Sequence, residues 1–438
     1  MSAVAHGRLR DVDLGDVLDA EGVVAVCAAD DIPGDNNYGS IVRDDPVFAD
    51  SLVQYAGQPV FAVAAESVDA ARRAARLARY DVEELEAVLD PLEAVSRDSF
   101  VLPSETRVRG DPDEALEAAQ HRVRRRVRVG GQDQFYLEGQ IAMAVPQEDG
   151  ALLVYSSTQH PDEVQRMIAH ATCREAKDIV VICRRMGGAF GGKESQAALI
   201  GVIAAIAADK TGRPCKLRLD RDDDMLMTGK RNDFVIDYDV GFDDTGRIVG
   251  VNFELASRCG MSADLSGPVN DRAMFHGDNA YFLENVRIVS HRCKTNTVSN
   301  TAFRGFGGPQ GMYAIEYVID DIARRLGKDP CEVRRRTFYG GDERNVTHYE
   351  QVVEDDIADE LFDRLLASSD YAKRRKEIRR FNENSRVLKK GIAITPVKFG
   401  ISFTSTLLNQ AGELVHVYRD GTVQLNHGGT EMGQGLYI

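Results

Sequence analysis

The first hundred residues alternate short apolar runs with polar, turn-forming segments. GVVAVCA (22–28) and QPVFAVAA (58–65) are continuous apolar runs bounded by turn residues, a pattern typical of buried strands. The apolar residues that follow Ser67 in SVDAARRAARLARY recur at helical spacing, and serine at this place caps a helix. DVEELEAVLDP (81–91) returns as a strand. These elements predict a small α+β domain over residues 1–105.

A run of arginines, RVRRRVRV at 122–129, follows this domain. Basic runs of this kind occur in arms that bind RNA, whereas alternation of arginine with valine favours an exposed strand. No aromatic residue interrupts the run, and the whole chain has a formal net charge of −15. We therefore expect an exposed strand, and we do not expect nucleic acid as a partner.

Two strand–loop–helix units follow residue 151. In the first, ALLVYSS is an apolar strand, STQ lies in the loop, and Pro161 stands in the first turn of the helix. In the second, DIVVICRR is the strand, MGGAFGGKE the loop, and SQAALIGVIAAIAADK (195–210) a helix so apolar all round that it must be deeply buried. If the two strands are parallel neighbours, Gln159 and Phe190 project from loops at the same edge of the sheet, where α/β folds bind ligands.

The rest of the chain predicts further turns and strands. LRLDRDDDM (217–225) predicts a half-exposed strand followed by a solvated acidic turn, and residues 237–255 form a hairpin around Asp-Asp-Thr-Gly. VSNTAFRGFGGPQGM (298–312) is a second glycine-rich loop that opens a helix. Two amphipathic helices then lead into a strand-rich unit from about residue 391, which ends in a third glycine loop. The pattern as a whole predicts a mixed fold, part α+β and part α/β.

Composition places this fold among ordinary globular proteins. The 438 residues are 43% hydrophobic and 28% charged, which suits a chain of several domains. No apolar run is long enough to cross a bilayer and no secretory signal core is recognisable, so we expect no membrane association. Seven scattered cysteines without a C-x-x-C pair argue against a zinc or iron–sulfur site in this chain and favour the reducing cytoplasm.

The loop MGGAFGGKE (186–194) shares one feature with a phosphate loop: four residues separate Gly187 from Gly192, and Lys193 follows. Glu194 stands where such loops carry a magnesium-binding Ser or Thr, and its carboxylate would repel phosphate. No later apolar strand ends in the lone Asp that holds the metal in such enzymes. A P-loop-like nucleotide-binding protein is therefore the weaker functional interpretation.

Glycines can also serve only a tight turn and close packing. Here, however, three glycine loops occur, at 187–192, 305–311 and 428–435, and the first two open helices. Glycine loops at helix N-termini present free backbone N–H groups and a positive dipole end to an anion. Three of them together favour one large phosphorylated cofactor over a single mononucleotide.

Five motifs resemble, in order and spacing, the molybdenum-binding subunit of the xanthine dehydrogenase/aldehyde oxidase family. They are STQ (157–159), RMGGAFGGKE (185–194), SNTAFRGFGGPQG (299–311), FGISFTSTLLNQAG (399–412) and HGGTEMGQG (427–435). The resemblance implies an α/β-hammerhead domain over 1–105, a first molybdopterin-binding domain over 115–350, and the truncated start of a second over 365–438. AHGRL resembles the second strand of the hammerhead domain, so we expect a fragment, clipped at both ends.

The resemblance also implies a cofactor and its neighbours. In this family molybdenum is bound by the dithiolene of molybdopterin and not by protein side chains. Gln159 matches a glutamine hydrogen-bonded to a molybdenum oxygen, and Phe190 and Arg304 match positions whose backbone lies beside the metal. Gln434 matches a glutamine that contacts the cofactor.

The implied substrate is a purine, hypoxanthine or xanthine, which would be hydroxylated to uric acid. Glu194 and Arg272 match the catalytic pair that holds and polarises the purine. Phe306 and Phe403 match the aromatics on the two faces of its ring, and Thr404 a hydroxyl beside it. Two phenyl faces suit a flat heteroaromatic ring, and an arginine can stabilise negative charge that develops on a purine oxygen.

The resemblance further implies partners. Electrons would pass through 2Fe–2S clusters and FAD, on a partner subunit or a missing region, to NAD⁺, and the intact enzyme would be a dimer of heterodimers. The glutamate that acts as general base in the family lies in a Gly-Glu-Pro motif, which these 438 residues lack. We therefore expect the chain alone to be inactive, and an inert assembly fragment of the subunit remains an alternative.

Overall fold

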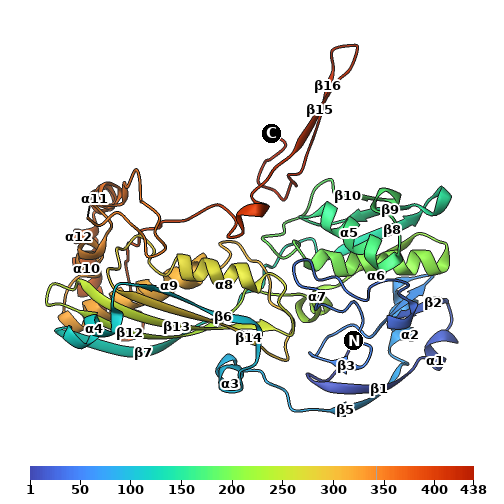
Figure 1. Cartoon of the computed structure of the whole chain (residues 1–438), viewed down its shortest axis with the longest axis horizontal. Helices are drawn as coiled ribbons and strands as arrows, with labels where there is room; N and C mark the ends of the chain where they lie inside the picture. The colour runs from blue at the N-terminus through green and yellow to red at the C-terminus, as the bar shows by residue number, and fades with distance from the viewer. Residues whose placement is uncertain (342) are drawn as a thin grey trace.

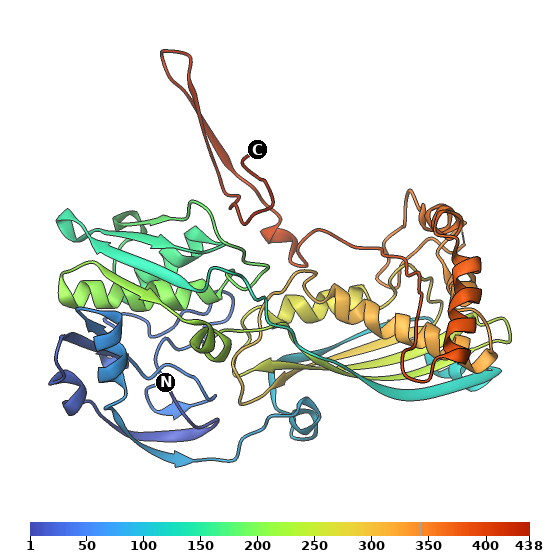
Figure 2. The same ribbon diagram turned by 180° about the vertical axis from the view of Figure 1, so that it is seen from behind.

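A computed structural model describes residues 1–341 and 343–438 of the chain. It has a mixed α/β fold in two lobes (Figure 1). The N-terminal segment and the layer that contains α5 and α6 form one lobe, and a five-stranded sheet covered by α8 and α9 forms the other. A C-terminal hairpin projects away from both lobes, as the view from behind also shows (Figure 2).

The N-terminal segment folds into two small antiparallel sheets, as its apolar runs predict. One has the order β3-β1-β5, and the other pairs β2 with β4. The Ser67 hydroxyl accepts a 3.2 Å hydrogen bond from the amide of Ala70, which confirms the predicted N-cap of α2. The element bounds are β1 Gly7–Asp13, α1 Gly15–Leu18, β2 Val23–Ala28, β3 Leu52–Val53, β4 Phe61–Ala65, α2 Val68–Ala75 and β5 Arg79–Glu84.

A four-stranded sheet of order β10-β9-β8-β11 carries the two predicted strand–loop–helix units. Strands β9 and β10 are parallel neighbours, as expected. Helix α6 is buried along nearly its whole length, and Gly212, with φ +62°, ends it. The bounds are β8 Ile141–Pro146, β9 Leu152–Ser156, α5 Pro161–Thr172, β10 Ile179–Ile182, α6 Gln196–Thr211 and β11 Cys215–Arg218.

The acidic run after β11 is not the solvated turn that its composition suggests. It forms helix α7 (Arg221–Met227), whose first amide groups are capped by Asp220 through a 2.9 Å bond from the amide of Asp223. Asp224 is buried and accepts a hydrogen bond from the Tyr136 hydroxyl at 2.7 Å. The prediction was wrong because acidic residues favour the first turn of a helix as strongly as they favour solvent.

The second lobe is built on a five-stranded sheet of order β6-β14-β13-β12-β7. Strands β12 and β13 form the predicted hairpin, while β13 and β14 are parallel and joined through α8. The arginine run forms β7, and its side chains pair with carboxylates of β12; Arg126 donates to Asp237 at 2.6 Å. The bounds are α3 Pro91–Ser96, β6 Phe100–Arg109, α4 Pro112–Ala118, β7 His121–Val129, β12 Phe234–Phe242, β13 Ile248–Gly260, α8 Ser266–Phe275 and β14 Val286–Lys294.

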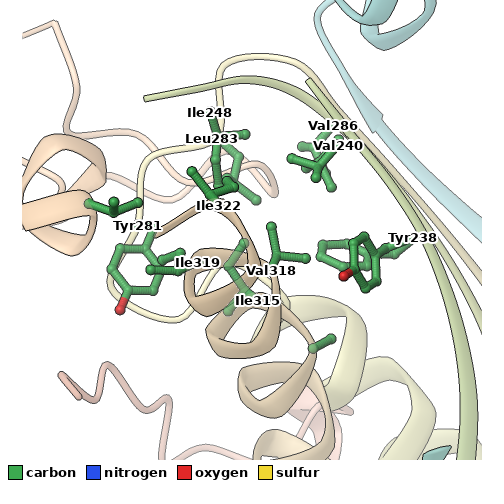
Figure 3. Packing of buried hydrophobic residues seen from close by; sticks show 14 of the residues in the cluster. Tyr238, Val240, Ile248, Tyr281, Leu283, Val286, Ile315, Val318, Ile319 and Ile322 are labelled. Carbon is green, nitrogen blue, oxygen red and sulfur yellow. The ribbon is translucent and has the colours of Figure 1, made fainter. Parts of the chain in front are cut away.

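Helix α9 (Gly308–Leu326) packs its apolar face on this sheet (Figure 3). Ile315, Val318 and Ile319 meet side chains of β12, β13 and β14, and all of them are buried. Each such side chain contributes about 1.5–3 kcal/mol when it is removed from water. This core fixes the start of α9, and therefore the second glycine loop, against the sheet.

Among its described residues, the C-terminal part has the α-helices α10 Pro330–Thr337, α11 Ala358–Ser368 and α12 Tyr371–Asn384, followed by the hairpin of β15 Glu413–Val417 and β16 Val423–His427. Every residue of β15 and β16 is exposed. The sequence predicted a strand-rich unit from about residue 391, but the first strand of this part begins only at Glu413. Residues 396–404, which we call the strap, are fixed by side chains of the α8 region instead of by a strand ladder.

Among the described residues, no helix combines the length and the apolar character that a membrane span requires.

Candidate functional site

The first glycine loop, residues 187–194, takes a path that depends on its glycines. Gly188 and Gly191 have φ of +92° and +97°, and Phe190 between them also has a positive φ of +55°. A Cβ on Gly191 would lie 2.8 Å from the carbonyl oxygen of Ala302, in the segment that leads to the second loop. Glycine is therefore required both by conformation and by the close approach of the two loops.

Lys193 points into the protein and away from any phosphate that the loop could cradle. Its side chain is fully buried, and Nζ donates to the carbonyl of Glu138 at 2.7 Å and to the Ser157 hydroxyl at 2.8 Å. Burial lowers the pKa of its ammonium group. The P-loop interpretation needs this lysine on the phosphates, so the geometry contradicts it.

The first and second glycine loops are joined by backbone contacts. The amide of Arg304 donates to the carbonyl of Phe190 at 2.9 Å, so two of the predicted cofactor neighbours touch. Arg231, which the sequence did not single out, donates to the carbonyl of Arg304 at 2.9 Å and lies over the ring of Phe303. The Arg304 side chain itself is exposed.

Gln159 and Glu194 also meet at this edge of the sheet. The amide oxygen of Gln159 accepts from the Gly191 N–H at 2.9 Å, and its Nε2 lies 3.4 Å from Glu194 Oε1. Burial raises the pKa of Glu194 to about 7, and the partial charge of nearby His160 opposes that rise. Near neutral pH this carboxyl group can therefore both donate and accept a hydrogen bond.

Arg272 comes from α8 and is turned towards the strap. Its Nη1 donates to the carbonyl of Gly400 and its Nη2 to that of Ser402. The guanidinium carbon lies 5.1 Å from the ring centre of Phe399 and 5.8 Å from that of Phe306. Nε is buried without a partner among the described residues, and burial lowers the pKa of the group. In the described part of the chain, Arg272 bonds strap carbonyls and the Glu194 carboxylate bonds Gln159, and the two side chains form no ion pair with each other.

The two predicted ring-stacking phenylalanines contact each other directly. Phe306, with φ +49°, and Phe403 have ring centres 5.5 Å apart and planes inclined by 48°. Phe403 is held by Asn409, whose side chain accepts from its amide at 2.7 Å and donates to its carbonyl at 2.8 Å. Thr404 follows, half-buried, and its hydroxyl has no hydrogen bond within residues 1–341 and 343–438.

The third glycine loop reaches the first through one backbone bond, from the amide of Met186 to the carbonyl of Glu431 at 2.9 Å. Gln434 is exposed, and its side chain closes a local turn with the backbone of Met432 and Thr430. Residues from all three glycine loops thus lie at one junction between the lobes. No group of three His, Cys, Asp or Glu side chains in the described residues is arranged to hold a metal ion.

Sequence reasoning missed the residues that hold these loops in place. Gln134 donates to Ala302 O at 2.9 Å, and Gln140 donates to Gly192 O at 2.8 Å. Their segment, GGQDQFYLEGQ, is too polar for a core strand and too aromatic for a solvated loop. This mixture of polar and aromatic residues is what could have indicated a buried, hydrogen-bonded segment.

A buried carboxylate, Asp264, joins three further parts of the site. It accepts hydrogen bonds from the Ser195 hydroxyl at 2.7 Å, from Gln196 Nε2 at 2.7 Å and from the Thr301 hydroxyl at 2.6 Å. Burial raises its pKa to about 6. It therefore ties the start of α6, the approach to the second loop and the start of α8 to one point, and nothing in the local sequence indicates this.

Comparison with family models gives a match along most of the chain. Residues 1–86 match the a/b hammerhead domain of aldehyde oxidase and xanthine dehydrogenase. Residues 97–338 match one molybdopterin cofactor-binding domain, and residues 364–438 match a second.

Individual relatives agree with these models. The chain is 44% identical to a xanthine dehydrogenase/oxidase of Gallus gallus and 40% identical to a xanthine dehydrogenase of Calliphora vicina, each over its full length. It spans about a third, 32%, of the length of either relative. Among solved structures, the aldehyde oxidoreductase of Desulfovibrio desulfuricans superposes with a TM-score of 0.83 at 23% identity, covering 97% of this chain and 48% of that one.

Proposed function

This chain belongs to the aldehyde oxidase and xanthine dehydrogenase family, and on that premise we propose that it holds molybdopterin beside a bound purine. The observation that carries the proposal is the meeting of three glycine loops with Phe306 and Phe403 at one junction. A cofactor with a phosphate and a heteroatom-rich ring system needs several backbone N–H groups, and this junction brings three glycine-rich loops together.

The residues present fit such a cofactor. A Cβ on Gly191 or Gly307 would meet protein backbone, at Ala302 and Val269 respectively, whereas a Cβ on Gly433 would meet nothing within 4 Å, so the open side for a cofactor lies at the third loop. The Gln159 amide lies beside the first loop with only a weak partner for its Nε2. Gln159, Phe190, Arg304 and Gln434 would border the cofactor. When bound, molybdopterin-held molybdenum supplies the two-electron oxidation that accompanies hydroxylation.

The chain's own contribution is to bind and orient the purine. Phe306 and Phe403 would take the two faces of the ring, which requires them to open from their present 5.5 Å centre-to-centre contact. Glu194, with a pKa of about 7, would hydrogen-bond to the ring edge in either protonation state. Arg272 would stabilise negative charge on a purine oxygen, and Thr404 offers an unused hydroxyl.

The proposed substrate and electron acceptors follow from the similarity to xanthine dehydrogenases. Several are xanthine dehydrogenases, so we propose xanthine or hypoxanthine as substrate, with electrons passing through 2Fe–2S and FAD centres of a partner or another region to NAD⁺. A cytoplasmic dimer of heterodimers and the domain division 1–105, 115–350 and 365–438 belong to the same proposal. The 438 residues alone should bind purine without turnover, because they contain no Gly-Glu-Pro base motif.

The test is to express the chain in a host that makes molybdopterin and to measure molybdenum content and xanthine affinity. We expect about one molybdenum per chain, and we expect Phe403→Ala to raise the xanthine dissociation constant by roughly tenfold or more. Tyr418→Ala, on the exposed hairpin, is the control and should change nothing. A chain that contains no molybdenum and binds no purine would support the alternative of an inert assembly fragment.

A further inference from the structure

The strap, residues 396–404, is an extended segment that owes its position to side chains at the end of α8. Asn279 donates to the carbonyl of Pro396 at 2.9 Å and accepts from the amide of Lys398 at 3.1 Å. The Lys398 ammonium group donates to the buried carboxylate of Asp278 at 2.8 Å. The amide of Gly400 donates to Nε2 of His276 at 3.0 Å.

This last bond fixes the tautomer of His276. Since the Gly400 N–H is the donor, Nε2 must be the unprotonated nitrogen of the ring. Nδ1 then carries the proton and donates to the carbonyl of Arg272 at 2.9 Å. The imidazole is therefore a neutral bridge between the backbone of α8 and the strap.

The surroundings of His276 favour this neutral form. Its side chain is only 6% exposed, and the ring of Phe399 lies 4.9 Å away, centre to centre. Burial lowers the pKa of His276 to about 4. Among the charged groups near it, Asp278 raises the pKa of His276, whereas Lys398 and Arg272 lower it.

The strap in turn shapes the purine clamp. The carbonyls of Gly400 and Ser402 accept hydrogen bonds from the two terminal nitrogens of Arg272. Phe403 is the next residue after Ser402 in the strap. Phe399 covers Gly308, where a Cβ would lie 2.7 Å from the phenyl ring, so the strap also rests on the second glycine loop. A shift of the strap would move the arginine and one stacking ring together.

We propose that His276 and Asn279 are positioning residues that hold the strap, and through it Arg272 and Phe403, in the geometry that reads the purine. The inference rests on the proposed function as far as the purine is concerned. The holding of the strap stands apart from that function and can be measured in the 438-residue chain by itself.

Two substitutions at His276 separate a specific hydrogen bond from mere filling of space. Glutamine places an amide oxygen near the former Nε2 and can still accept from Gly400, whereas phenylalanine keeps the ring shape and loses both bonds. In amide exchange, His276→Phe should speed exchange of residues 398–404 by roughly tenfold or more, with peptides of α9 unchanged. His276→Gln should remain within about threefold of the native chain. His121→Phe, at a partly exposed histidine far from the strap in sequence, is the matched control.

Equal exchange in the Phe and Gln variants would overturn the positioning role. A measurement on the unmodified chain keeps the test decisive if the Phe variant does not fold. Nitrogen-15 spectra of labelled histidine should show one ring with Nδ1 protonated and Nε2 bare from pH 8 down to pH 5. An Nε2–H tautomer for His276 would overturn the inference.

Purine binding then distinguishes this inference from the function beneath it. In molybdenum-loaded protein, His276→Phe should raise the xanthine dissociation constant roughly tenfold at unchanged metal content, and His276→Gln should restore it. If the native protein binds no purine while the strap still loosens as described, the proposed function fails and the positioning role stands. If the native protein binds purine and His276→Phe binds it equally well, the positioning role fails.

Discussion

The second and third glycine loops are both rich in glycine but have very different surroundings. Gly307 has φ +92°, and a Cβ there would lie 1.9 Å from the carbonyl oxygen of Val269 in α8. Gly433 has φ +104°, and a Cβ there would meet nothing within 4 Å. The one loop needs glycine for packing and for conformation, the other for conformation alone. The third loop is therefore open around Gly433, although side chains of the loop occupy several of its amides, while the second loop is already packed against the protein.

The first and third loops differ in the same way in their hydrogen bonds. The first loop is held by hydrogen bonds of three side chains that are at least half-buried. Lys193 donates to the carbonyl of Glu138, Gln140 donates to the carbonyl of Gly192, and Gln159 accepts from the amide of Gly191. The third is organised by Glu431, whose Oε1 accepts from the amides of Gly433 at 2.6 Å and Gly435 at 3.2 Å. The first loop is thus held by side chains from other parts of the chain, whereas the third loop is held mainly by hydrogen bonds within itself.

The largest difference in stability should appear when one methyl group is added to the second loop, at Gly307, and to the third loop, at Gly433. Gly307→Ala should lower the free energy of unfolding by about 4 kcal/mol or more, because backbone must move as well as adopt a strained φ. Gly433→Ala should cost about 1 kcal/mol, from the strain of its φ alone. Chemical denaturation of both variants measures the difference, and equal costs would contradict the contrast between the loops.

Lys193→Met should have the next largest effect. It leaves the carbonyl of Glu138 and the hydroxyl of Ser157 without their donor, which costs about 2–3 kcal/mol of stability. Lys177→Met, at an exposed lysine, is the control. ATP affinity should be negligible in the native chain and in both variants. Tight ATP binding lost only in the Lys193 variant would restore the phosphate-loop interpretation.

The titration of Glu194 gives a smaller, pH-dependent effect. Its pKa of about 7 lies above the ordinary value of 4.5, so the native state holds a proton that the unfolded state has released between these two values. Stability therefore falls as pH rises from about 4.5 through 7. Glu194→Gln removes that loss and should gain about 1–2 kcal/mol on the native chain between pH 5 and 8, after allowance for its partial exposure.

Chemical denaturation at pH 5 and at pH 8 measures this gain in the free energy of unfolding, and Glu148→Gln, at an exposed glutamate, is the control. A constant difference between the Glu194→Gln variant and the native chain would show that Glu194 ionises normally.

The smallest global effect belongs to Glu431→Gln. Because the third loop packs little, we expect unfolding free energy to change by less than about 0.5 kcal/mol. Amide exchange in residues 430–437 should nevertheless accelerate several-fold, since the charged acceptor of that turn is weakened. A large loss of global stability would mean that this loop is part of the core after all.

The sequence predicted the features that depend on local pattern. The parallel pair β9–β10, the buried α6 and the cap at Ser67 follow from periodicity and turn residues, which each segment carries by itself. The parallel arrangement of the two strands placed Gln159 and Phe190 in loops at the same edge of the sheet, and the structure has them there.

Features that depend on contacts between distant segments could not be predicted. The inward turn of Lys193 depends on a carbonyl 55 residues earlier, and the strap lacks a ladder because side chains more than a hundred residues away satisfy it. Asp264 shows the same limit, since one aspartate in SADLS looks no different from a surface residue. Such residues acquire their roles only when segments that are distant in the sequence meet in the fold.

The most direct test of the central claim is a density map of the molybdenum-loaded protein with a bound purine. We expect the purine ring between Phe306 and Phe403, its edge at Glu194 and Arg272, and the cofactor against the backbone of all three glycine loops. A purine bound elsewhere, or a cofactor that leaves the loops at Gly191 and Gly433 untouched, would contradict it.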